Sequence, residues 1–284
     1  MSDLPTHPPE MRLDSGDTPE TPAYRQAGPA DRDSLSRRDG IRAVAFDCYG
    51  TLIDFTDVAF KRVYHEICLA QDLGCDGITL WDKWMDIWRR MASQGRAREN
   101  PRNEATSWTL SRPTLAFRPY AEEWPEHFEA CFRELGVRGD GVSAYEHVRN
   151  GLAEAPAFEE TAEVLSTLKT RYLIGILSNA DDDFLTACLE KNGLHTEFEV
   201  IVTSESAGFY KPHEDIFHSF CEATGMARHE VLYVGDSQSA DVLGAKNAGM
   251  PVAWLNRDGS PLREGVPQPD HEIASLCDLL DLLP

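Results

Sequence analysis

The chain has 284 residues, of which 42% are hydrophobic, and carries a formal net charge of −21 from 27 basic and 48 acidic side chains. This length is enough for one domain with a large insertion or for two small domains. The strong negative charge argues against nucleic acid or an anionic membrane surface as a general partner, so we expect neither.

The cysteines and the amino terminus predict a cytoplasmic protein. Seven cysteines are scattered along the chain without a CxxC pair, which is typical of reduced thiols. The amino terminus has neither the basic start nor the apolar core of a signal peptide, and no apolar run approaches the length of a membrane span.

The first 39 residues differ in composition from the rest. Residues 1–39 hold six of the seventeen prolines and few large apolar side chains, so we predict a disordered tail. From Ile41 onwards, apolar runs bounded by turn residues alternate with helical periodicity. This alternation predicts an α/β fold, in which crossover helices connect the strands of a parallel sheet.

The pattern predicts five strands and several helices. The strands are Ile41–Phe46, Tyr172–Leu177, Glu199–Thr203, Val231–Val234 and Val252–Leu255. Helices are expected at residues 159–170, 181–192, 213–224 and 239–248, and a last amphipathic helix at 273–283. Glycines follow three of these helices directly, as is common at helix ends: Gly193, Gly225 and Gly249.

Residues 57–152 predict an all-helical insertion between the first two strands. This stretch shows almost no strand pattern and holds five of the six tryptophans. Three of them, Trp81, Trp84 and Trp88, lie on one face of a predicted helix. That face is more often the core of such an insertion than a wall facing a substrate.

The same insertion contains a local excess of positive charge. Seven arginines lie between Arg89 and Arg118, against two acidic residues. They can face an anionic substrate, or they can pair with the acidic surface of the rest of the protein. The sequence leaves both readings open.

Polar residues follow the predicted strands where the strands end. A ligand site in an open α/β sheet lies at the carboxyl ends of the strands, so these side chains are expected to converge on one pocket. The segments, in chain order, are Asp47-Cys48-Tyr49-Gly50-Thr51, Ser178-Asn179, Lys211-Pro212 and Val234-Gly235-Asp236-Ser237-Gln238-Ser239-Ala240-Asp241. Each segment alone is weak, because the same residues also suit turns, surface charges and helix N-caps.

Together and in this order, the four segments resemble the motifs of the haloacid dehalogenase (HAD) superfamily. The resemblance implies a Rossmann-like catalytic core at residues 40–56 and 153–284. It also implies that residues 57–152 form a helical cap of the C1 type. Alternation along the first strand points Cys48 away from the side chain of Asp47, so Cys48 is not the expected nucleophile.

The resemblance also assigns roles to individual residues. Asp47 is implied as the nucleophile, with Tyr49, Ser178 and Lys211 completing the catalytic set. Substrate binding is implied for Thr51, Ser178 and Asn179, and for Arg89, which follows Trp88 as a halide- or carboxylate-binding arginine does in dehalogenases. The implied Mg²⁺ ligands are Asp47, the backbone carbonyl of Tyr49, and Asp236. Asp241 is implied to lie next to these ligands without contacting the metal directly.

Tyr49 and Asp236 point to different reactions. In phosphatases of the superfamily the place of Tyr49 is taken by a second Asp, which protonates the leaving group, a step worth about 10²–10⁴ in rate. A phenol is a poorer acid at neutral pH. Dehalogenases have Tyr there, because halide leaves without a proton. They use no metal, however, and carry Ser and Asn in the segment that here contains Asp236.

We give more weight to Asp236, because an added carboxylate would repel a haloacid. The favoured prediction is therefore a Mg²⁺-dependent phosphatase of a small organophosphate, acting through an aspartyl-phosphate at Asp47. One alternative is an (S)-2-haloacid dehalogenase that forms an ester at Asp47 without a metal. Another is a catalytically weak HAD-like scaffold that binds an anion or a partner protein. A small anionic substrate is expected for either enzyme, and a homodimer is left open.

Overall fold

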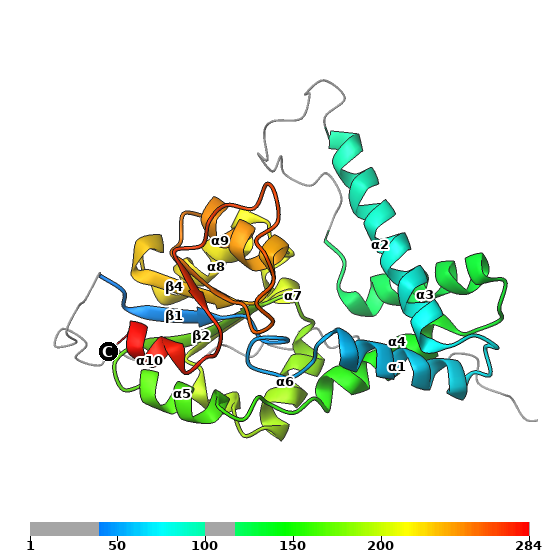
Figure 1. Ribbon diagram of the computed structural model, residues 1–284, viewed down its shortest axis with the longest axis horizontal. Helices are drawn as coiled ribbons and strands as arrows, with labels where there is room; N and C mark the ends of the chain where they lie inside the picture. Colours follow the sequence, from blue (N-terminus) through cyan, green and yellow to red (C-terminus); the bar gives the residue numbers. More distant parts are fainter. Residues whose placement is uncertain (1–39, 100–116, 284) are drawn as a thin grey trace, which may run out of the picture. The chain divides into compact units, whose positions relative to one another are not determined.

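The structure is a computed structural model that describes residues 40–99 and 117–283 (Figure 1). The predicted tail at residues 1–39 lies outside the described residues. Within them, no helix is both long enough and apolar enough to cross a membrane.

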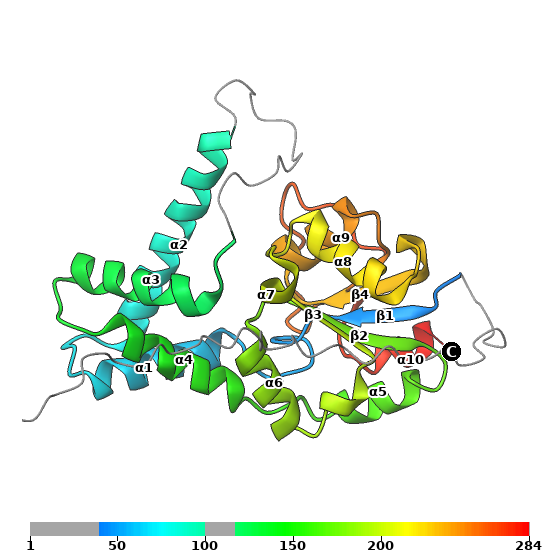
Figure 2. The ribbon, with the colours of Figure 1, turned by 180° about the vertical axis from the view of Figure 1, so that it is seen from behind.

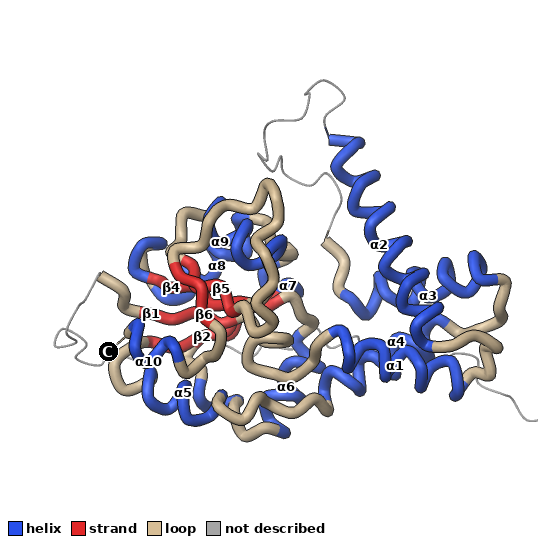
Figure 3. Tube along the Cα trace, viewed as in Figure 1, coloured by secondary structure: helices blue, strands red, loops and turns tan. Residues whose placement is uncertain are grey.

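The centre of the fold is a six-stranded parallel sheet in the order β3-β2-β1-β4-β5-β6 (Figure 3). Its strands are β1 (Ala43–Phe46), β2 (Leu173–Ser178), β3 (Val200–Thr203), β4 (Val231–Gly235), β5 (Val252–Leu255) and β6 (His271–Ile273). The central strand β1 therefore lies between β2 and β4. This order brings the ends of the three strands that precede Asp47, Asn179 and Asp236 together at one edge of the sheet.

Helices cover both faces of the sheet (Figures 1 and 2). Val44 and Phe46 pack on one face, and Ala43 and Ala45 pack on the other, because successive side chains of a strand point to opposite sides. The first face is covered by α5 (Thr161–Leu168), α6 (Asp182–Lys191) and α10 (Asp278–Leu282). The second is covered by α8 (Glu214–Thr224) and α9 (Leu243–Asn247).

Between β1 and α5, the described part of the chain forms four helices joined by loops and turns. Its helices are α1 (Asp57–Ala70), α2 (Gly77–Glu99), α3 (Tyr120–Leu135) and α4 (Gly141–Ala153). Together with the parallel sheet, this helical insertion confirms the predicted fold class.

The tryptophan face of α2 is buried only in part. Trp81 and Trp84 are 9% and 5% exposed and pack against Tyr64, whereas Trp88 is 50% exposed. The buried stripe continues through Ile87 instead. The interpretation as cap core therefore holds for two of the three tryptophans.

The carboxyl-terminal part differs most from the sequence prediction. Residues 273–283, expected as one helix, contain the end of β6 and the short helix α10. The carboxylate of Asp278 accepts hydrogen bonds from the N–H groups of Ala274 (2.8 Å) and Ser275 (3.1 Å). These bonds hold the connection in a turn, so the helix begins only at Asp278.

The helix expected at 239–248 is also interrupted. Residues Gln238–Val242 form a π-helical turn, and the α-helix α9 starts at Leu243. The hydroxyl of Ser237 accepts a hydrogen bond from the N–H of Ala240 at 3.2 Å and so caps this turn. Single π-helical turns inside helices are frequent at functional sites.

Candidate functional site

Asp47 follows β1 directly, and its carboxyl group is held by one oxygen only. Its N–H donates to the carbonyl of Val234 at 2.8 Å, which fixes the backbone to the end of β4. Oδ1 accepts hydrogen bonds from the hydroxyl of Ser178 (2.8 Å) and the ammonium of Lys211 (2.6 Å). No described residue donates to Oδ2. One oxygen of Asp47 is thus anchored, while the other has no donor among the described residues.

The ammonium of Lys211 is shared among three acceptors. Besides Asp47, Nζ donates to Oδ1 of Asp241 (2.7 Å) and to the hydroxyl of Tyr233 (2.9 Å). Burial disfavours the charged amine, but the negative charges of Asp241 and Asp47 outweigh it and raise the pKa of Lys211. An ammonium has three N–H groups, so the protein uses all of them. Lys211 acts here as a fixed counter-charge for the carboxylates.

Asp241 is buried, and both of its oxygens are already bonded. Oδ1 accepts from Lys211 and from the hydroxyl of Tyr233 (2.9 Å), and Oδ2 accepts from the N–H of Ser237 (2.8 Å). Space is also tight, because a Cβ at Gly235 would lie 2.4 Å from Cγ of Asp241. Asp241 therefore positions the ammonium group of Lys211.

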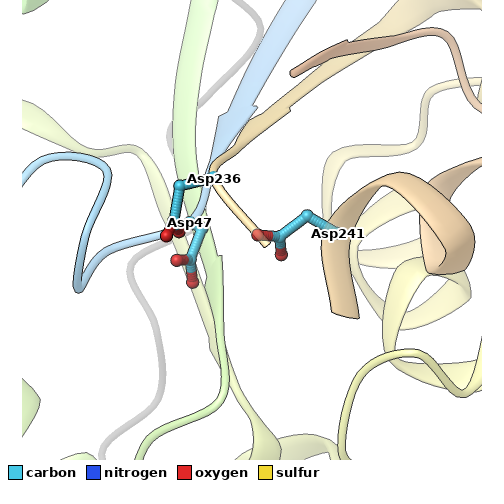
Figure 4. Close-up of side chains that lie close together, drawn as sticks. All are labelled: Asp47, Asp236 and Asp241. Atoms are coloured by element: carbon cyan, nitrogen blue, oxygen red, sulfur yellow. The ribbon is translucent and has the colours of Figure 1, made fainter. Parts of the chain in front are cut away.

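Asp236 lies beside Asp47 at the end of β4 (Figure 4). One carboxylate oxygen from each of Asp47, Asp236 and Asp241 lies within 4.8 Å of the other two. Although part of Asp236 is exposed, partial burial of its carboxyl group and the charges of Asp241 and Asp47 raise its pKa to about 8. Gly50 lies opposite it with φ +89°, a conformation that favours glycine, and a Cβ there would lie 2.8 Å from Oδ2 of Asp236.

The free oxygens fit a magnesium site. Oδ2 of Asp47 and the carboxylate of Asp236 are hard oxygen ligands of the kind that Mg²⁺ prefers. Within the described residues, the backbone carbonyl of Tyr49 accepts no hydrogen bond, so it can serve as a third ligand. Asp241 does not fit as a direct ligand, because both of its oxygens accept bonds from the protein.

The phenol of Tyr49 is bonded towards α6. Its hydroxyl lies 3.5 Å from the carbonyl oxygen of Phe184, and its ring packs against the rings of Phe55 and Phe184 at 6.1 and 5.9 Å. Burial raises the pKa of Tyr49, so the phenol stays protonated. Burial also raises the pKa of Cys48 well above its usual value, which agrees with the exclusion of that thiol as the nucleophile.

Asn179 and Thr51, expected to bind substrate, have side chains bonded within the protein. The amide of Asn179 accepts from the N–H of Lys211 (2.7 Å) and donates to its carbonyl (3.2 Å), so Asn179 fixes the backbone of Lys211. The hydroxyl of Thr51 makes a long contact of 3.4 Å to Oδ1 of Asp236.

The arginines of the insertion are placed in different ways. Arg89 is exposed on α2, and no hydrogen bond or ion pair joins it to another residue in the described parts of the chain. Arg90 pairs with Glu134 at 2.8 Å, and Arg118 pairs with Glu126 at 2.7 Å. For Arg90 and Arg118 the structure therefore shows ion pairing inside the insertion.

Two residues near the site, Tyr233 and Asp181, were not predicted from the sequence. Tyr233 is fully buried, and its hydroxyl lies 3.0 Å from the carbonyl of Leu177 in addition to its bonds with Lys211 and Asp241. A tyrosine inside an apolar strand was a usable signal, because a buried hydroxyl needs a partner. The second, Asp181, lies three residues after Ser178 and accepts two backbone hydrogen bonds from α3.

Comparisons with known proteins agree on a family and differ on the reaction. A family model described as haloacid dehalogenase-like hydrolase matches residues 41–249. The chain is 28% identical over 248 residues to (S)-2-haloacid dehalogenase 4A of Burkholderia cepacia, which covers 86% of this chain and 96% of that protein. It is 36% identical over 158 residues to pyrimidine 5'-nucleotidase YjjG of Escherichia coli (strain K12), with coverage of 55% and 69%.

Solved structures share the fold. A dehalogenase with an intermediate complex superposes with a TM-score of 0.66 at 22% identity, over 87% of this chain and 99% of that one. The putative HAD-hydrolase YfnB from Bacillus subtilis, bound to magnesium, gives a TM-score of 0.68 at 23% identity, over 86% and 98%. One of these relatives is a dehalogenase and the other binds magnesium.

Proposed function

We propose, since this chain belongs to the haloacid dehalogenase-like hydrolases, that it hydrolyses small 2-haloacids through an ester at Asp47. Oδ2 of Asp47 attacks the carbon that bears the halogen, and the halide leaves with the bonding electrons. Water then attacks Cγ of the ester, which releases the 2-hydroxy acid and a proton and restores the carboxylate. The similarity to dehalogenases over 86% of this chain supports this reading over the partial match to a nucleotidase.

The observation that carries the proposal is the placement of Tyr49. An alkoxide leaving group needs a proton, and the phenol at this position is bonded to the carbonyl of Phe184. Its raised pKa makes it a weaker acid still. A halide leaves without a proton, so the reaction at Asp47 proceeds without help from residue 49.

The raised pKa of Asp236 weakens the sequence argument for a phosphatase. That argument held that a second carboxylate would repel a haloacid. Burial of its carboxyl group and the charges of Asp241 and Asp47 raise the pKa of Asp236 to about 8, which favours its protonated form when no metal is bound. In that form it adds little negative charge opposite the carboxylate of the substrate.

A Mg²⁺-dependent phosphatase is the second candidate, and Asp236 is the residue that favours it. Asp47, Asp236 and the carbonyl of Tyr49 would hold the ion, which would neutralise the phosphate when bound. Oδ2 of Asp47 would then attack phosphorus. Because Asp236 serves the metal in this candidate, it is not free to protonate the leaving group, so substrates with good leaving groups suit it best.

Isotope labelling separates the two reactions at the nucleophile itself. In H₂¹⁸O, a dehalogenase places heavy oxygen in the carboxyl group of Asp47, because water attacks Cγ. A phosphatase places it in phosphate, because water attacks phosphorus. The protein is incubated with 2-chloropropionate and EDTA, or with p-nitrophenyl phosphate and Mg²⁺, and the peptide that contains Asp47 is weighed by mass spectrometry.

We expect chloride release in EDTA and a mass gain on the peptide that contains Asp47. The Asp47→Asn variant is the matched control, because it keeps the size of the side chain and removes the nucleophile. Phosphate release that requires Mg²⁺, without chloride release from 2-chloropropionate, would replace this proposal with the second candidate. The absence of both activities would favour the third reading, a scaffold without turnover.

A further inference from the structure

The start of α3 is capped by a residue from the loop that carries Ser178 and Asn179. The first N–H groups of a helix have no partner inside the helix, and the N-cap residue of α3, Pro119, makes no side-chain hydrogen bond to them. The carboxylate of Asp181 takes this place: Oδ1 accepts from the N–H of Tyr120 (2.9 Å) and Oδ2 from the N–H of Ala121 (2.8 Å). The cap thus comes from a residue 61 positions further along the chain than Tyr120.

Residues 117–121, which contain the start of α3, also contact the loop that carries Lys211. The hydroxyl of Tyr210 donates to the carbonyl of Arg118 at 2.9 Å. The ring of Tyr210 lies 4.9 Å from that of Tyr120 and 5.0 Å from that of Phe117, between centroids. Residues 117–121 are therefore tied to two of the loops that hold the nucleophile in place.

We propose that Asp181 is a positioning residue that fixes the beginning of α3 against the Ser178 and Lys211 loops, and so sets how the helical insertion covers the active site. The inference concerns substrate binding and not the leaving group. It therefore stands whether the substrate is a haloacid or a phosphate ester.

The surroundings of Asp181 suit this role. The residue is 2% exposed, and no lysine or arginine pairs with it among the described residues. The cost of burying the Asp181 carboxylate is offset by its two bonds to N–H groups and by the partial positive charge of a helix N-terminus. Burial, together with nearby Glu205 and Asp183, outweighs the two backbone bonds and raises the pKa of Asp181 to about 6. At neutral pH the carboxylate is ionised and can accept both bonds.

Asparagine at this position would disrupt the contact without changing the size of the side chain. Its oxygen can accept one N–H, but its NH₂ group would face the other donor. Asp140 offers a matched control, because it caps α4 from within the insertion by accepting from the N–H of Ser143 at 2.7 Å. Asp140→Ala weakens a helix cap without touching the catalytic loops, whereas asparagine would still cap α4 at this position.

Two measurements test the inference. Hydrogen–deuterium exchange follows the amides of Tyr120 and Ala121, and steady-state kinetics follow chloride release from 2-chloropropionate, or phosphate release from p-nitrophenyl phosphate if no chloride appears. We expect Asp181→Asn to speed exchange at both amides and to raise KM several-fold. Asp140→Ala should lower the melting temperature and leave KM unchanged.

Unchanged exchange at Tyr120 and Ala121 would overturn the inference, as would equal changes in KM for Asp181→Asn and Asp140→Ala. If Asp181→Asn does not fold, Tyr210→Phe replaces it, because it removes the bond to Arg118 and keeps the ring. It should raise KM in the same direction, and no change would again contradict the proposal. The exchange measurement needs no substrate, so it can fail independently of the proposed reaction.

Discussion

Replacing Lys211 by methionine tests whether one buried ammonium allows Asp47 and Asp241 to stay ionised side by side. Nζ lies 2.6 Å from Oδ1 of Asp47 and 2.7 Å from Oδ1 of Asp241, and Lys211 is 6% exposed. Methionine retains most of the length of the side chain and removes the charge. Loss of one partner of a buried ion pair costs about 3–5 kcal/mol of unfolding free energy. For a chain of this size, that loss lowers the melting temperature by roughly 6–20 °C.

The loss should depend on pH in a defined direction. Burial and the charge of Asp47 raise the pKa of Asp241, and Lys211 lowers it, so without the ammonium the folded variant holds a proton on Asp241 at pH values where the unfolded chain binds none. Its stability is then present at low pH and falls as pH rises, by up to about 1.4 kcal/mol per pH unit for one proton. The destabilisation relative to wild type should therefore be larger at pH 8 than at pH 6.

Urea unfolding at pH 6 and pH 8 measures this for the wild type, Lys211→Met, Asp241→Asn and the double variant. The double variant should recover much of the lost stability at pH 8, because it removes one of the two opposed charges. It should not recover turnover, since Asp47 still lacks its counter-charge. A loss below about 1 kcal/mol at pH 8, or an equal loss at both pH values, would refute the role of Lys211 as counter-charge.

Three further predictions follow from the hydrogen-bond network and the raised pKa of Asp236. Tyr49→Phe should leave kcat within about threefold, because the hydroxyl bonds to Phe184, whereas loss of a general acid would lower kcat by about 10²–10⁴. Tyr233→Phe removes an acceptor of Lys211, so it should lower the unfolding free energy, measured in urea, by about 1–3 kcal/mol. It should also lower kcat, with a smaller change in KM. An unchanged kcat would contradict this. Because the folded state raises the pKa of Asp236 to about 8, wild type in EDTA should lose thermal stability as pH rises from 6 to 9, and Asp236→Asn should show a smaller drop. Equal drops in melting scans would show that Asp236 does not titrate there.

Most of the sheet could be predicted because its strands are buried on both faces and read as short apolar runs. Val252–Leu255 was predicted with the bounds that the structure shows, and β1 to β4 differ from their predicted bounds by one or two residues at their ends. The edge strand β6 could not be found in this way. Two of its three residues, His271 and Glu272, are exposed, so no apolar run marks it.

The sequence predicts which residues gather at the site better than it predicts what they bond to. Asp47, Ser178 and Lys211 meet because their loops follow strands that end at the same edge. The directions of the side chains of Asn179 and Tyr49 depend on partners 32 and 135 residues away in the chain. Such pairings arise from the packed loops, and no local pattern encodes them.

The space that a side chain at position 50 would need is filled by the carboxyl group of Asp236, although the two residues are far apart in the sequence. A methyl group at position 50 would fall within 2.8–3.1 Å of all three terminal atoms of the Asp236 carboxyl group. In the observed conformation, a side chain at position 50 would therefore push the carboxyl group of Asp236 aside. Asp236 can be replaced while Gly50 is kept, but any side chain added at position 50 displaces the carboxylate at position 236, so a change at position 50 also changes the metal-binding character of this site.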